Sequence, residues 1–152
     1  MDSNVEVPID KIDKNDIFEN FEAKKKAYEK FYSERSFQDK LKKYTKKAGA
    51  YGVYLPKLLY NTMKSPSTPI SNKAMIVAGL GYFICPIDVI SDILPVIGFT
   101  DDIAVMGMVA KKLAGSITKD IAEDTIHEVS DIFGTDMDEI KSLIKSKDKE
   151  SK

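Results

Sequence analysis

The sequence predicts an all-α protein, organised as a small helical bundle of five or six helices. Apolar residues recur every three or four positions through most of the chain, and no segment alternates apolar and polar residues as a half-buried strand does. Hydrophobic residues make up 43% of the 152 residues, which is enough for one core of ordinary size. The single cysteine and the single histidine exclude an internal disulfide and a site with several histidine ligands.

The first two predicted helices carry aromatic stripes. From Asp16, a residue type that suits a helix N-cap, apolar residues recur at helical spacing as far as Tyr32. Ser36 is expected to cap a second helix, whose stripe begins at Phe37 and continues beyond Pro56. Because proline lacks an amide hydrogen and clashes with the preceding turn, we expect Pro56 to kink this helix or to divide it.

The most apolar part of the chain predicts a central antiparallel helical hairpin. Its two helices are expected over 72–85 and 101–114, with the connector 86–100 folded across one end. Both helices are nearly continuously apolar, which is typical of helices that are buried on every side. Gly79 and Gly81 lie inside the first of them, where we expect them to permit close helix packing.

Two further helices and the chain ends complete the expected domain. A fifth helix over about 116–133 ends at Gly134, and a short sixth helix follows it. The polar composition of the ends predicts a flexible N-terminus over 1–15 and a disordered tail over 146–152. A single helical domain is therefore expected over 16–145.

Segments that direct a protein into a membrane are not expected in this chain. The first six residues are polar and acidic, unlike the basic and apolar start of a signal peptide. The longest uncharged run, 74–87, has 14 residues, whereas a membrane-spanning helix needs about 20. We expect a cytoplasmic protein that is able to associate with a membrane surface, and shallow insertion of the apolar part 74–114 is the open alternative.

Residues 81–102 contain two linked motifs, Tyr-x-x-x-Pro-x-Asp-x-Ile-Ser-Asp and Pro-x-x-Gly-Phe-x-Asp-Asp. This stretch resembles the signature of the YkvA-like family, a widespread bacterial domain of unknown function, and the similar core covers about 37–114. Ser91 departs from the pattern, because the family usually has proline there. The resemblance implies a helical fold that is often labelled membrane-associated, and it implies no established activity. The residues that match the pattern are Tyr82, Pro86, Asp88, Ile90, Asp92, Pro95, Gly98, Phe99, Asp101 and Asp102.

Four aspartates in this stretch, Asp88, Asp92, Asp101 and Asp102, are the only acidic residues in the apolar middle of the chain. Carboxylates are ligands that Mg²⁺ and Ca²⁺ prefer, so the four residues form a candidate metal site for one of these cations. They also suit helix capping: the last two lie where a helix is expected to start, and the first two can accept bonds from free N–H groups of the connector. Capping without any cofactor is the first interpretation, and metal binding is the alternative.

A basic face on the second predicted helix is the other candidate site. Phe37, Leu41 and Tyr44 lie on the opposite side, so the helix is amphipathic. A basic amphipathic helix can lie on an anionic membrane surface or bind a protein partner, and it can equally form an ordinary solvated surface. The basic residues are Arg35, Lys40, Lys42, Lys43, Lys46 and Lys47.

These features favour a non-enzymatic interaction module, either peripheral on a membrane or bound to a protein partner. The alternative is a divalent-cation-dependent enzyme that uses the aspartate cluster. Lys and Arg total 23 and Asp and Glu total 24, and the resulting net charge of -1 argues against a nucleic-acid partner.

Overall fold

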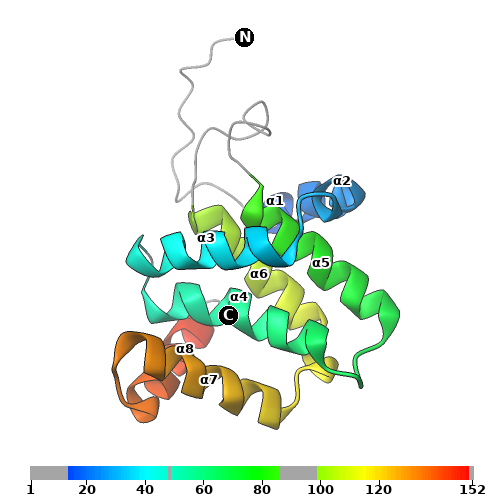
Figure 1. Cartoon of the computed structure of the whole chain (residues 1–152). Coiled ribbons are helices and arrows are strands. Elements are labelled where there is room, and N and C mark those ends of the chain that lie inside the picture. Colours follow the sequence, from blue (N-terminus) through cyan, green and yellow to red (C-terminus); the bar gives the residue numbers. More distant parts are fainter. Residues whose placement is uncertain (1–13, 48, 86–98, 151–152) are drawn as a thin grey trace.

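A computed structural model describes residues 14–47, 49–85 and 99–150 (Figure 1). Within these stretches the chain forms eight α-helices and a 3₁₀-helix over Ala114–Ser116, and it forms no strand, which confirms the all-α class. The α-helices are α1 Lys14–Ala23, α2 Lys25–Glu29, α3 Glu34–Lys47, α4 Ala50–Lys64, α5 Ile70–Ile84, α6 Phe99–Lys112, α7 Lys119–Phe133 and α8 Met137–Glu150. The last helix therefore continues into the range predicted as a disordered tail, whereas most of the predicted flexible N-terminus lies outside the described residues.

The helix count exceeds the predicted five or six because two predicted helices are each divided. The first is interrupted at Lys24, whose φ of -116° and ψ of 14° depart from helical values. The second is interrupted at Gly49, which has an extended conformation as the N-cap of α4. Glycine costs a helix interior about 1 kcal/mol relative to alanine, so a break is favoured at this residue. Pro56 does not divide the helix, since it lies buried inside α4.

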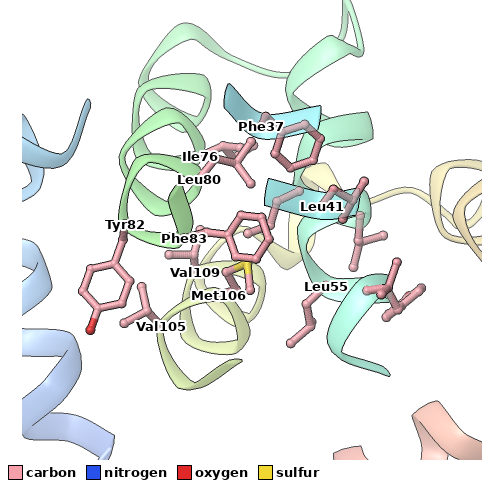
Figure 2. Close-up of a cluster of buried hydrophobic side chains, with 14 of the residues drawn as sticks. Phe37, Leu41, Leu55, Ile76, Leu80, Tyr82, Phe83, Val105, Met106 and Val109 are labelled. Atoms are coloured by element: carbon pink, nitrogen blue, oxygen red, sulfur yellow. The ribbon is translucent and has the colours of Figure 1, made fainter. Parts of the chain in front are cut away.

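α5 is the helix around which its neighbours pack. Every residue from Ala78 to Phe83 is buried, as expected for a helix that is apolar all round. α2, α3, α4 and α6 all contact it. Figure 2 shows Phe83 of α5 close to Met106 and Val109 of α6, which are fully buried. The two helices of the predicted hairpin therefore pack together in the core, while their antiparallel direction stays a prediction.

The sequence predicts that Gly79 and Gly81 permit close packing on α5, and only Gly81 has a neighbour too close for a side chain. A Cβ added at Gly79 would lie 3.4 Å from Val109 Cγ2 of α6, which is a normal packing distance. A Cβ added at Gly81 would lie 2.7 Å from the carbonyl carbon of Tyr28 in α2, and closer still to its oxygen. Because the obstacle at Gly81 is backbone, only glycine allows α2 to sit where it does.

We expect Gly81→Ala to destabilise the protein by about 1–3 kcal/mol, the usual cost of overpacking a core. Gly79→Ala is the matched control: its Cβ meets a side chain at contact distance, and the better helix propensity of alanine favours the variant by up to about 1 kcal/mol. Urea unfolding followed by circular dichroism measures both. Equal unfolding midpoints for the two variants would contradict the close approach of α2 to α5.

Candidate functional site

The start of α3 is fixed by a local cap. The Ser36 N–H donates to Ser33 Oγ at 3.0 Å, so Ser33 is the N-cap and the helix begins at Glu34. The predicted cap, Ser36, lies instead in the first turn. Arg35 is therefore inside the helix and in register with the lysines that follow it.

The inner side of α3 is anchored by aromatic contacts, which confirms the predicted amphipathic pattern. Phe37, Leu41 and Tyr44 are buried. The Phe37 ring stacks on Tyr60 of α4, with centroids 4.8 Å apart, and the Tyr44 ring meets Phe83 of α5 edge-on at 4.9 Å. These contacts hold the helix on both α4 and α5, so its orientation is set by the core.

The outer side of α3 carries four of the predicted basic residues, Arg35, Lys42, Lys43 and Lys46, which we call the α3 basic face. All four are exposed. Steps of seven and four residues separate Arg35, Lys42 and Lys46, which places them on one side of the helix, opposite the buried residues. Within the described part of the chain none of the four forms an ion pair. Asp39 lies on the same side, so the face has a net charge of +3.

Two of the six predicted residues are not placed on this face. Lys40 is half-buried, and its Nζ lies 5.7 Å from the centroid of the buried Phe83 ring, in a cation–π contact. Lys40 therefore contributes to packing between α3 and α5, and its part in a membrane or partner surface stays a prediction. The side chain of Lys47 lies outside the described residues.

Glu34 ties the start of α3 to α4 through Tyr60 and also bonds Tyr32 just before α3, and no sequence pattern indicated either contact. Its carboxylate accepts a hydrogen bond from the Tyr60 hydroxyl and another, at 3.3 Å, from the Tyr32 hydroxyl. Burial and the adjacent carboxylate disfavour a phenolate, so the pKa of Tyr60 is raised to about 12 and that of Tyr32 is raised as well. Glu34 and Tyr60 are 26 residues apart, and no local periodicity connects them.

A neighbouring side of α4 contacts α7 through a polar network. Asn61 Nδ2 donates to Thr125 Oγ1 at 2.9 Å and to Glu128 Oε1 at 2.7 Å, and Lys57 Nζ lies 3.6 Å from Glu128 Oε2. The other acidic residues of α7 point to solvent and are exposed. They are Asp120, Glu123, Asp124 and Asp131. α3 and α7 therefore present opposite charges on different sides of α4.

The candidate metal site is largely outside the described residues. Asp88 and Asp92 fall in the segment 86–98, and Asp101 and Asp102 belong to the first turn of α6, with side chains that are not described. Among the side chains that are described, no group of three histidine, cysteine or acidic residues is arranged to hold a metal ion. Cation binding and capping by these aspartates both stay predictions.

Part of the chain is similar to a family of unknown function. The model of a family described as "protein of unknown function (DUF1232)" matches residues 72–108, which include most of α5 and α6 and the motifs at 81–102. The match supports a domain of unknown function, and the narrower YkvA-like resemblance stays a prediction. No curated protein and no solved structure matches the chain. No helix in the described ranges is long and apolar enough to cross a membrane.

We expect Tyr60 to titrate near pH 12 instead of near 10, the usual value for tyrosine. Because the folded state favours the neutral hydroxyl, its contribution to stability is fully present below pH 10 and is lost as the pH rises through about 12. The alkaline absorbance titration is recorded for the unmodified protein and for Tyr60→Phe. The difference between the two curves reports the ionisation of Tyr60. A difference centred near pH 10 would contradict the hydrogen bond to Glu34.

Proposed function

We propose that this chain is a non-enzymatic module that docks on an anionic membrane surface through the α3 basic face. The observation that carries the proposal is the set of four exposed cations on α3, none of which forms an ion pair among the described residues. An ordinary solvated helix face usually mixes both signs of charge, whereas this face holds one carboxylate, Asp39, against four cations.

The anchored inner side of α3 supports docking without insertion. Phe37 and Leu41 are already buried in the core, so α3 has no free apolar side to place among lipid chains. Binding then depends on charge alone. Each basic residue near an anionic surface contributes about 1 kcal/mol, so a net charge of +3 gives about 3 kcal/mol and a dissociation constant of roughly millimolar order or weaker.

In this proposal the helices of the family match remain a folded scaffold. We propose that 72–85 and 101–114 form the antiparallel hairpin and that the hairpin stays covered by its neighbours on the membrane. Insertion would carry the nearby aspartates toward the bilayer centre, at a cost of about 2.5–3.5 kcal/mol each on insertion scales. A cytoplasmic, peripheral location on the membrane follows from the same charge pattern.

Flotation with phosphatidylserine vesicles tests the proposal. We expect the protein to float with vesicles at low salt and to be released at physiological salt, where the screening length falls to about 8 Å. Replacing the charges in Lys42→Gln, Lys43→Gln and Lys46→Gln together is expected to weaken binding at low salt about tenfold to a hundredfold, since three contributions of about 1 kcal/mol are removed before screening.

A matched control removes three exposed lysines from α7 and α8, in Lys119→Gln, Lys141→Gln and Lys145→Gln. It changes the total charge by the same amount, so equal losses for the two triple variants would contradict a specific role for α3. Absence of flotation at low salt would make a protein partner the better interpretation. Flotation that resists salt would show that apolar insertion, and not the α3 basic face, provides the binding.

A further inference from the structure

Charge is distributed very unevenly between two parts of the fold. Residues 24–47, which include α2 and α3, contain ten basic and three acidic residues, a net charge of +7. α7 contains one lysine and five acidic residues, a net charge of -4 with His127 neutral. The whole chain has a net charge of only -1, so this separation is invisible in the total.

The lysines of α2 lie on its exposed side because Tyr28, on the other side, packs in the core. The Tyr28 ring is buried and lies 5.8 Å from Phe21 and 4.9 Å from Tyr82, measured between ring centroids. Lys26 and Lys30 are two residues before and after Tyr28, which places both on the opposite side of the helix. Both are exposed, and neither forms an ion pair within the described ranges.

α2 and α3 direct their polar sides away from the same core helix. Tyr28 of α2 packs against Tyr82 of α5, and Phe37 and Tyr44 of α3 pack against Phe83, the next residue of α5. Figure 1 shows the two helices together at one end of the molecule. Their exposed basic residues therefore lie on the outer sides of two helices that pack on consecutive residues of α5.

α7 lies at the other end of the molecule, with α4 between it and α3 (Figure 1). Packed helix axes are about 8–10 Å apart, so the α7 axis lies roughly 16–20 Å from that of α3. When α3 faces an anionic surface, the acidic residues of α7 are farther from it by this distance, so their repulsion is weaker than the attraction of the nearer lysines. When the molecule is turned over, α7 is repelled.

We infer that the protein docks on an anionic lipid surface in a single orientation, with α2 and α3 against the headgroups and α7 facing water. In this orientation Lys24, Lys26 and Lys30 of the α2 region belong to the docking surface together with the α3 basic face. The inference rests on the proposed function and adds to it the extent of the surface and the direction of the bound molecule.

Single labels distinguish the two ends of the molecule. Cys85 is the only cysteine and is buried, so Cys85→Ala gives a background for labelling Ala27→Cys in α2 or Ile132→Cys in α7. Both positions are exposed and uncharged, and labelling them leaves the charge pattern intact. An environment-sensitive fluorophore is attached, and vesicles of phosphatidylserine and phosphatidylcholine with a headgroup-linked quencher are added at low salt.

We expect quenching at position 27 to be at least several-fold stronger than at position 132, and no quenching at either position with pure phosphatidylcholine. Equal quenching, or stronger quenching at 132, in protein that still floats with the vesicles would overturn the single orientation and leave the proposed function standing. Absence of flotation of both labelled proteins and of the unlabelled protein would overturn the proposed function itself.

A second triple variant tests whether the lysines of the α2 region belong to the docking surface. Lys24→Gln, Lys26→Gln and Lys30→Gln together are expected to weaken flotation several-fold, while the α7 and α8 control triple leaves it unchanged within twofold. Unchanged flotation of the α2 triple variant, with circular dichroism showing the same helix content, would exclude α2 from the docking surface.

Discussion

The close approach of the α2 backbone to α5 at Gly81 determines how the basic half of the molecule is arranged. The Tyr28 carbonyl occupies the space where any other residue at position 81 would have its Cβ. With the carbonyl seated there, the Tyr28 ring reaches Phe21 and Tyr82, and the lysines of α2 are left on the outer side. Only four residues, 30–33, separate α2 from α3, so the position of α2 also limits where α3 can begin.

The surface chemistry of α3 is a consequence of its inner contacts. Phe37 stacks on Tyr60 and Glu34 accepts the Tyr60 hydroxyl, so packing and hydrogen bonding act on the same pair of helices. A helix that is held in this way cannot rotate to satisfy its outer charges with neighbouring carboxylates. The core thus maintains the four cations of the α3 basic face, which are unpaired among the residues that the structure describes. A surface of one charge sign carries a cost in self-repulsion.

Sequence patterns predicted what depends on local periodicity and missed what depends on distant contacts. The apolar run gave the core helix to within two residues at its start, since α5 begins at Ile70 and 72 was expected, and Gly134, with φ of 64°, ends α7 as predicted. The break at Lys24 has no glycine or proline to mark it. The contact between Lys40 and Phe83 had no sequence signal, because the two residues are 43 positions apart and lie in different helices. The role of the four aspartates, in cation binding or in capping, stays a prediction because their side chains lie outside the described residues.

In the proposed membrane-bound state, α5 remains the buried helix while α2 and α3 form the surface that meets lipid. Hydrogen–deuterium exchange of the full chain, with and without phosphatidylserine vesicles at low salt, tests both parts in one measurement. We expect amides of 76–84 to be the slowest to exchange in both samples. Vesicles are expected to slow exchange in 24–47 and to leave exchange in α7 unchanged. Vesicle-dependent changes centred on 74–114, with none in 24–47, would contradict it and would indicate that the apolar helices themselves enter the membrane.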